Sequence, residues 1–340
     1  MASADLNGDG LLDLVATESQ SPNFAVFFGL ADGGLGAPTE YFGTDGQALA
    51  LGDVNGDGLP DVAVSDGPSL QIFLNEGSGT LNPVPLIVFL DATGITEISI
   101  ADFNHDGLAD LVIGYATSPT FQIAFLFGEA GGMFSAPHVI PGIGVETPLF
   151  VGDLNQDGIP DIVLNTSDGY HLAVFLNQGD GGFQISYYPL QSGGQIVSLP
   201  GDGGAPDLAF GSAKANGIQV LKNSGHGAFS IGPLYPGPGA DGGYPGGTGT
   251  WLTVGDFNGD CLPDIATDYA PREGCEQSGA EVLVLYGNGD GGFDPPVSLP
   301  PPSNEPGGLA SLGLVAHPAA FAVGDFCNGG AAVYGNASKR

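Results

Sequence analysis

Short runs of alternating apolar residues recur along the chain, and a Gly-rich turn follows many of them. Clear examples are Ala25–Gly29, Val174–Asn177 and Val284–Gly287, each followed by a turn that contains Asp-Gly-Gly. A run and turn of this kind predict a strand, a hairpin and a second strand. No segment shows the 3.6-residue periodicity of a helix, so the pattern predicts an all-β chain.

A nine-residue acidic motif, Asp-x-Asn-x-Asp-Gly-x-x-Asp, recurs between these strand pairs. Complete copies begin at Asp5, Asp53, Asp102 and Asp153, in steps of 48, 49 and 51 residues. A further copy begins at Asp256, with Cys261 in place of the glycine. The step from 153 to 256 is 103 residues, about two periods, and the degenerate copy Leu199–Asp207 lies between them. A last remnant is Gly324–Gly330.

Each period has room for four short strands: one before the acidic loop, one after it, and two around the hairpin. Tandem four-stranded units of about 40 to 50 residues are typical of propeller blades, whereas a leucine-rich repeat is shorter. The chain is therefore predicted to be a single β-propeller domain over residues 1–340, with the alternative that it is a piece of a longer protein. The expected repeat units are residues 1–45, 46–95, 96–145, 146–192, 193–240, 249–300 and 306–340.

The ends of the chain leave two blade numbers open. Met1–Ala4 looks too short for a first strand, and residues 306–340 offer only about two strands, which favours a seven-bladed propeller. Alternatively, Ala319–Asp325 pairs beside Leu11–Ala16 and closes a six-bladed ring.

Composition changes this picture mainly through charge. The 60 Gly and 27 Pro fit many turns, and 42% hydrophobic residues with a mean hydropathy of +0.16 can form a core. Only 5 Lys and Arg oppose 38 Asp and Glu, a net charge of −33. Such a chain has too few cations to neutralise nucleic-acid phosphates, and an anionic membrane repels it. No apolar stretch reaches the length of about 20 residues that spans a bilayer, and no signal peptide is visible at the N-terminus.

The acidic motif is predicted to bind calcium. Oxygen-bearing side chains at positions one, three and five of a tight loop converge on one point, and the glycine at position six allows the sharp turn. A backbone carbonyl at position seven and the Asp at position nine complete a shell of hard oxygen ligands that favours Ca²⁺. An EF-hand would need an acid at position twelve, where this chain has Ala16, Val64, Ile113 or Leu164. The competing interpretation is an Asx-rich turn without an ion.

The expected metal ligands are the residues at positions one, three, five, seven and nine of each loop. Four complete sites are expected, and the Asp256 loop is weaker because Cys261 must adopt a left-handed conformation. The loops around Asp202 and Asp325 are expected to have lost the ion. The ligands are Asp5, Asn7, Asp9, Leu11 and Asp13; Asp53, Asn55, Asp57, Leu59 and Asp61; Asp102, Asn104, Asp106, Leu108 and Asp110; Asp153, Asn155, Asp157, Ile159 and Asp161; and Asp256, Asn258, Asp260, Leu262 and Asp264.

These repeats resemble the FG-GAP/VCBS family of propellers, which includes the integrin α-subunit head. The family signature is visible at Phe28-Gly29 followed by Gly36-Ala37-Pro38, and more loosely at Phe127-Gly128 followed by Ser135-Ala136-Pro137. The resemblance implies that the acidic loop joins strands one and two of each blade and holds structural Ca²⁺. It also implies an extracellular, secreted or cell-surface module, because members act in adhesion, in lectin-like binding and as accessory domains of secreted enzymes. The chain is expected to be monomeric in isolation.

The predicted partner is an extracellular protein or a glycan. The longest irregular segments, Ile231–Thr250, Thr267–Ala280 and Pro300–Gly308, are expected on the face opposite the acidic loops, where loops on a rigid scaffold often bind ligands. The candidate ligand-binding residues in them are Tyr235, Tyr244, Asp268, Tyr269 and Arg272. The alternative is an insertion without a partner. Trp251, at the edge of this region, is expected in the core.

An enzyme is less favoured by the sequence. No GxSxG or HExxH motif is present, and the five histidines are scattered. The alternative function is an accessory or catalytic domain of a secreted polysaccharide lyase or hydrolase, in which Arg272 would neutralise a uronate. The three cysteines, Cys261, Cys275 and Cys327, allow one disulfide and one free thiol, and Cys261 and Cys275 are the closest pair in sequence.

Overall fold

The computed structural model describes most of the chain up to residue 299 and two short strands beyond it. The described residues are 1–17, 23–42, 48–90, 93–117, 120–140, 145–166, 171–179, 182–189, 196–201, 204–212, 217–236, 252–269, 281–289, 291–299, 321–325 and 330–334. The regular elements in this part are all strands, which confirms the all-β prediction. Over the same residues, no helix combines the length and the apolar character that crossing a membrane requires.

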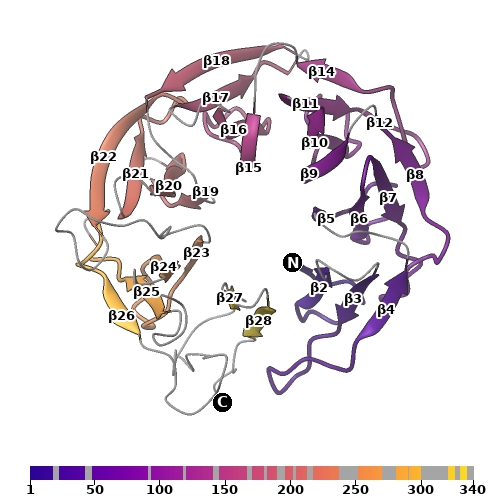
Figure 1. Ribbon diagram of the computed structural model, residues 1–340, viewed down its shortest axis with the longest axis horizontal. Helices are drawn as coiled ribbons and strands as arrows, with labels where there is room; N and C mark the ends of the chain where they lie inside the picture. Colours follow the sequence, from indigo (N-terminus) through magenta and orange to yellow (C-terminus); the bar gives the residue numbers. More distant parts are fainter. Residues whose placement is uncertain are drawn as a thin grey trace. The chain divides into compact units, whose positions relative to one another are not determined.

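Six antiparallel sheets of four strands each follow one another along the chain, and within each sheet the strands lie side by side in sequence order (Figure 1). The first sheet contains β1 (Ala2–Ala4), β2 (Asp13–Thr17), β3 (Asn23–Phe27) and β4 (Thr39–Phe42). The second contains β5 (Leu49–Gly52), β6 (Asp61–Asp66), β7 (Ser69–Phe73) and β8 (Leu86–Phe89). The third contains β9 (Gly94–Ala101), β10 (Asp110–Thr117), β11 (Thr120–Leu126) and β14 (His138–Ile140), with the small hairpin β12 (Gly128–Glu129) and β13 (Met133–Phe134) between the last two.

The remaining sheets repeat this order. The fourth contains β15 (Val145–Gly152), β16 (Asp161–Thr166), β17 (Leu172–Asn177) and β18 (Phe183–Tyr188). The fifth contains β19 (Ile196–Leu199), β20 (Asp207–Ser212), β21 (Gly217–Asn223) and β22 (Phe229–Pro236). The sixth contains β23 (Leu252–Gly255), β24 (Asp264–Tyr269), β25 (Glu281–Leu285) and β26 (Val297–Leu299). The four strands that the sequence predicts for each period are present in all six.

The described residues contain six four-stranded sheets and no complete seventh one. The only strands after the sixth sheet in this part of the chain are β27 (Phe321–Asp325) and β28 (Gly330–Tyr334), which pair with each other. Met1–Ala4 was expected to be too short for a first strand, and this is wrong: Ala2, Ser3 and Ala4 pair with Val15, Leu14 and Asp13. Within unit 1, β1 and β3 occupy the two edges of β2, so β2 has no free edge for a further strand.

The chain forms two compact units. Unit 1 comprises Met1–Gly152, Gly158–Asp168 and Phe175–Ser186, and unit 2 comprises Asp153–Asp157, Gly169–Val174 and Tyr187–Arg340. Within unit 1, one apolar cluster packs the first sheet against the second, with Val15 and Phe24 meeting Val62 and Phe73. A second cluster packs the second sheet against the third. Within unit 2, the fifth and sixth sheets share a core that includes Val220 and Ile265.

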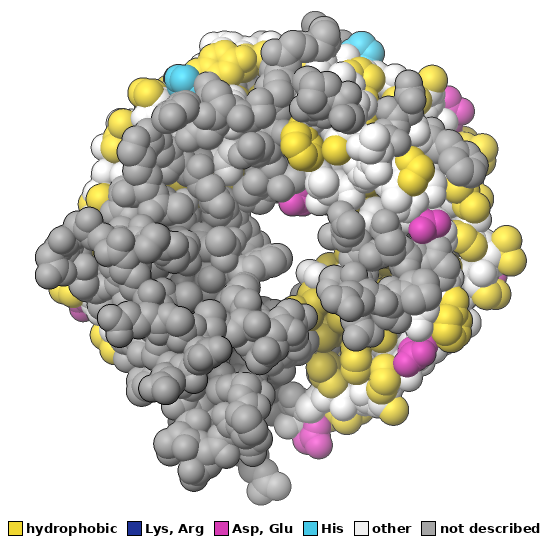
Figure 2. Space-filling view, in the orientation of Figure 1, with side chains coloured by type: hydrophobic (Ala, Val, Ile, Leu, Met, Phe, Trp, Pro, Cys, Tyr) yellow, Lys and Arg dark blue, Asp and Glu magenta, His cyan; other side chains and the backbone are white. Residues whose placement is uncertain are grey.

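Burial follows the position of a strand in its sheet. The middle strands β7 and β17 are buried along their whole length, because the sheet is covered on both faces. The fourth strands β4, β18 and β22 are mostly exposed and carry apolar side chains such as Phe42, Ile185 and Ile231 in contact with water. Among the described side chains in Figure 2, hydrophobic ones are numerous, acidic ones lie between them, and no Lys or Arg is in view.

Two segments expected to be irregular, Ile231–Thr250 and Thr267–Ala280, begin as strand. Ile231–Pro236 belongs to β22, where Ile231 pairs with Leu221 and Tyr235 with Ile218. Pro233 and Pro236 interrupt the apolar pattern, but an edge strand tolerates proline because its outer N–H groups need no partner. Thr267–Tyr269 likewise completes β24.

Candidate metal loops and the clamps beside them

Each of the five acidic loops connects the first and second strands of a sheet, as the family resemblance implies. In the second sheet, β5 ends at Gly52, the loop runs from Asp53 to Asp61, and Asp61 is also the first residue of β6. The residue at position two is buried and anchors the loop: Leu6, Val54, Phe103, Leu154 and Phe257 are at most 4% exposed.

The carboxylate at position one organises the turn. In the second sheet, Asp53 Oδ1 accepts hydrogen bonds from the backbone N–H groups of Gly56 at 2.7 Å and Asp57 at 3.1 Å. Asp53 Oδ2 accepts a third from Gly58 N–H at 2.7 Å. The Asp5 and Asp256 carboxylates accept the same three bonds in their loops. This carboxylate therefore holds the loop in one conformation.

The side chains at positions three and five lie against each other. Asn55 Nδ2 donates to Asp57 Oδ2 at 2.9 Å, and Asn55 Oδ1 accepts from Asp57 N–H at 2.8 Å. The Asn–Asp pair is repeated in the other four loops, at 2.9 to 3.1 Å between the side chains. These oxygens have the donor chemistry of a calcium site. In this conformation, however, no group of three or more His, Cys, Asp or Glu side chains among the described residues is arranged to hold a metal ion.

Each loop contains two left-handed residues, although the sequence pattern predicts only the one at position six. Position six has φ between 67° and 86°, and position four has φ between 59° and 82°. Position four is glycine in three loops, but it is His105 in the third and Gln156 in the fourth. Position six is glycine except at Cys261, which has φ 67° and an exposed, free thiol.

Replacing Cys261 with glycine is expected to stabilise the protein by about 1 kcal/mol, because glycine adopts positive φ without the steric cost that a side chain carries. The measurement is the urea midpoint of the variant against the wild type in reducing buffer. Cys261→Ala is the matched control, since it removes the thiol but keeps the Cβ. Equal effects of Gly and Ala would contradict the backbone explanation.

The Asp at position nine is a buried clamp. Asp61 is fully buried, its Oδ2 accepts Val54 N–H at 2.9 Å, and its Oδ1 accepts Asn75 N–H at 2.7 Å. It thereby ties the start of the loop to the end of the third strand. Asp13, Asp110 and Asp264 make the same pair of contacts. Burial raises the pKa of the Asp61, Asp110 and Asp264 carboxyls, and the backbone hydrogen bonds partly oppose that rise in pKa.

The clamp role was missed in the sequence, although a signal for it was present. The degenerate fifth copy keeps Asp207 at position nine and lacks the acids at positions one, three and five. Because Asp207 is present where the other expected metal ligands are missing, the Asp at position nine has a structural role that does not depend on a metal ion.

A second clamp joins neighbouring sheets. Asn75 Nδ2 donates to the Leu6 carbonyl of the preceding sheet at 2.8 Å and to the Pro60 carbonyl of its own sheet at 3.1 Å. Asn177 makes the corresponding bond to the Phe103 carbonyl, and Asn223 to the Leu154 carbonyl. In the first, third and sixth sheets the equivalent residues are Gly29, Gly128 and Gly287, where a Cβ would collide with a backbone carbonyl.

A third contact concerns one of the candidate ligand-binding residues. The Tyr235 hydroxyl accepts Phe293 N–H at 3.0 Å, and the two rings meet edge to face with centroids 5.4 Å apart. Tyr41 and Tyr188 accept N–H groups of Leu81 and Phe229 in the same way, so this contact between sheets recurs. The repeated Tyr on the fourth strand is the sequence signal that would have revealed it.

Tyr235 is the only one of the five candidate ligand residues whose side chain is described. Asp268 and Tyr269 lie at the end of β24, and only their backbone is described. The other candidates, Tyr244 and Arg272, lie outside the described residues, as do Trp251, Cys275 and Cys327. The proposed binding surface therefore stays a prediction.

Comparison with known proteins agrees with this architecture. A family model described as an FG-GAP-like repeat matches residues 5–64 and 53–113. Integrin alpha-3 of Cricetulus griseus is 25% identical over 150 residues, which cover 37% of this chain and 14% of the integrin. Integrin alpha-7 of Homo sapiens is 27% identical over 141 residues, which cover 36% of this chain and 12% of the integrin.

Two solved structures share the fold. A lectin from Agrocybe aegerita that recognises non-reducing terminal N-acetylglucosamine superposes with a TM-score of 0.60 at 20% identity, over 88% of this chain and 79% of the lectin. A periplasmic gluconolactonase from Pseudomonas aeruginosa superposes with a TM-score of 0.61 at 16% identity, over 84% and 82%. The sequential four-stranded sheets and these neighbours define the chain as a β-propeller. Its acidic repeats match an FG-GAP-like repeat over residues 5–64 and 53–113, and they are similar to segments of integrin alpha chains.

Proposed function

We propose that this propeller is a calcium-stabilised, non-catalytic module that acts outside the cell by binding a protein or a glycan. The observation that carries the proposal is the recurrence of one oxygen-donor set at the same place in five sheets, within a chain whose repeats resemble those of integrin alpha chains.

Calcium binding is supported by the chemistry of the loops. Positions one, three and five offer carboxylate and carboxamide oxygens, and the residues at position five, such as Asp57, are exposed to solvent. A hard divalent cation prefers such oxygens and would offset part of the net charge of −33. Position nine differs, because backbone N–H groups already engage both of its carboxylate oxygens. Each carboxylate oxygen keeps further lone pairs, so a clamp can also be a ligand.

The ligand class is supported by the relatives. Integrin alpha chains carry similar repeats, and the Agrocybe aegerita neighbour recognises a terminal sugar. A rigid scaffold of sheets with variable connecting segments suits such binding. The candidate surface is that of Tyr235, Tyr244, Asp268, Tyr269 and Arg272.

Calcium titration of the metal-free protein is expected to show four tight sites and a weaker fifth, and calcium is expected to raise the melting temperature because the ion binds the folded state. Asp57→Ala should remove one ion from the stoichiometry and leave the others. Asp32→Ala is the matched control, since Asp32 is an equally exposed acid in a hairpin outside the loops. Melting that is unchanged by a chelator, with no ion bound at millimolar calcium, would contradict the proposal.

The ligand is tested with a glycan array and with a screen for lyase and hydrolase turnover. Binding without turnover, lost in Arg272→Ala, supports a binding module. Turnover that is lost in Arg272→Ala would show instead a catalytic domain that acts on polysaccharide.

A further inference from the structure

The fifth repeat lacks the acidic loop and keeps only its clamp. Asp207 is 1% exposed, and its Oδ1 accepts Asn223 N–H at 2.7 Å, as Asp61 does from Asn75 and Asp161 from Asn177. The equivalents of positions one, three and five are Leu199, Gly201 and Gly203, which offer no side-chain oxygen.

The second oxygen of Asp207 has no backbone partner at position two. In the first, second, third and sixth sheets, Oδ2 of the clamp accepts the N–H of the position-two residue at 2.7 to 2.9 Å. In the fifth repeat this residue is Pro200, which has no N–H to donate. A buried carboxylate that loses a hydrogen bond is strongly destabilised unless another donor replaces it.

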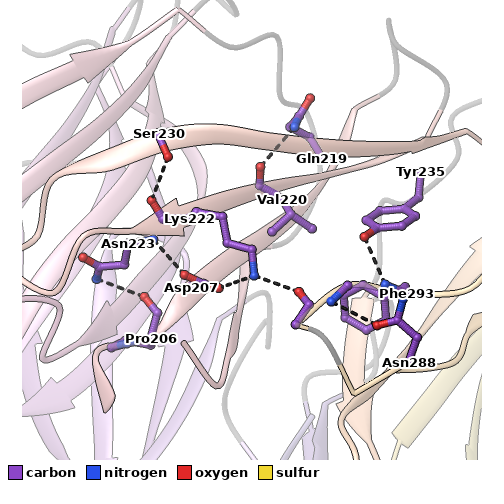
Figure 3. Close-up of polar contacts among 12 residues, drawn as sticks. Pro206, Asp207, Gln219, Val220, Lys222, Asn223, Ser230, Tyr235, Asn288 and Phe293 are labelled. Atoms are coloured by element: carbon purple, nitrogen blue, oxygen red, sulfur yellow. Dashed lines mark hydrogen bonds and ion pairs between the residues drawn. The ribbon is translucent and has the colours of Figure 1, made fainter. Parts of the chain in front are cut away.

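Lys222 supplies that donor. Its Nζ lies 2.8 Å from Asp207 Oδ2, with the lysine side chain 33% exposed and the aspartate side chain 2% exposed. The same ammonium donates to the Gly291 carbonyl at 2.8 Å, in the hairpin of the sixth sheet (Figure 3). One cation therefore neutralises the clamp of the fifth sheet and ties that sheet to the next.

The lysine is specific to this repeat. Lys222 directly precedes Asn223, the residue that donates its N–H to the clamp Asp207. At the equivalent position, the other five sheets have an apolar or aromatic residue: Phe28, Leu74, Phe127, Leu176 and Tyr286. Of the five Lys and Arg residues in the chain, Lys222 is the only one within the described part. A comparable contact occurs in unit 1, where the hairpin of the second sheet lies over the acidic loop of the first sheet. A Cβ at Gly79 in that hairpin would be 3.4 Å from Asn7 Cβ in the loop. Lys222 thus occupies the equivalent region between a loop and the next hairpin.

We propose that Lys222 is a built-in cation that takes the place of the backbone donor missing at Pro200, so that the fifth sheet, which lacks the acidic loop, is tied to the sixth sheet without an added ion. The contrast with the other repeats rests on the proposed calcium binding. The tether itself rests only on the contacts of Lys222.

Hydrogen exchange followed by mass spectrometry tests both parts, with and without calcium. In the wild type, peptides covering β21 and the residue 286–293 hairpin should exchange equally in calcium and in chelator, whereas the Asp53–Asp61 peptide should exchange faster in chelator. Lys222→Met should speed exchange of the β21 and hairpin peptides by about a hundredfold in both buffers, because it leaves a buried carboxylate unpaired.

Two further variants keep the result interpretable. Lys222→Arg retains the charge and should stay within about threefold of the wild type, whereas Lys222→Gln keeps a donor without the charge and should resemble Lys222→Met. Exchange unchanged in Lys222→Met, or a fifth-sheet peptide that needs calcium in the wild type, would overturn the proposal. If the chelator changes no loop peptide but Lys222→Met still acts, calcium binding fails and the tether stands.

Discussion

Replacing Asp61 with alanine is expected to destabilise the second sheet and its neighbours by about 3 to 5 kcal/mol in calcium-free buffer. The change leaves the buried N–H groups of Val54 and Asn75 without their acceptor, and each such loss costs about 1 to 3 kcal/mol. The removed side chain also leaves a small void in a closely packed region. The measurement is the shift of the urea unfolding midpoint at fixed pH in the presence of a chelator.

The matched control for Asp61→Ala is Asp57→Ala, four residues earlier in the same loop. Asp57 is exposed, so water replaces its hydrogen bonds and the expected destabilisation in chelator is at most about 0.5 kcal/mol. The pair separates a clamp from a metal ligand, because only the clamp matters when no ion is present. Equal destabilisation by the two substitutions in chelator would show that position nine has no structural role beyond the loop.

Replacing Glu97 with glutamine is expected to stabilise the protein at pH 8 by up to about 3 kcal/mol and to change little at pH 4.5. Burial raises the pKa of the Glu97 carboxyl from 4.5 to about 7, and the Met1 ammonium opposes part of that rise in pKa. Glu97 lies on β9 opposite Gly114, whose lack of a side chain leaves room for it.

The sign follows from the raised pKa. A carboxyl with a higher pKa in the folded state contributes its stability in full below pH 4.5 and loses that contribution as the pH rises through about 7. A shift from 4.5 to about 7 corresponds to about 3 kcal/mol, reduced by any solvent screening.

The difference between wild type and Glu97→Gln isolates this carboxyl, because Asp61, Asp110 and Asp264 also have raised pKa values and titrate in both proteins. Thermal or urea unfolding of both proteins from pH 4.5 to 8 measures it. Glu76→Gln, an exposed hairpin acid, is the control and should show no such trend. A constant difference between wild type and Glu97→Gln over this range would contradict the expected titration.

Local patterns were sufficient to predict the repeated elements. Periodic apolar runs, glycine turns and the acidic motif depend on neighbours in sequence, so the four strands of each period and the position of the acidic loop between strands one and two could be predicted. The left-handed geometry at Cys261 follows from the same local logic. The first strand was missed because three small residues, Ala2 to Ala4, carry no apolar signal and pair only because β2 offers them a free edge.

The sequence by itself determined the class of the protein and the oxygen-rich composition of its loops, because repeats and turns depend on residues that are close together in the sequence. Only the tertiary structure decided what holds the sheets together. Asp61 accepts hydrogen bonds from residues 7 and 14 positions away, Asn75 reaches a carbonyl 69 positions away, and Lys222 another 69 positions away. Such partners become neighbours only when the chain has folded, because hydrogen bonds between sheets depend on position in space and have no fixed spacing in sequence.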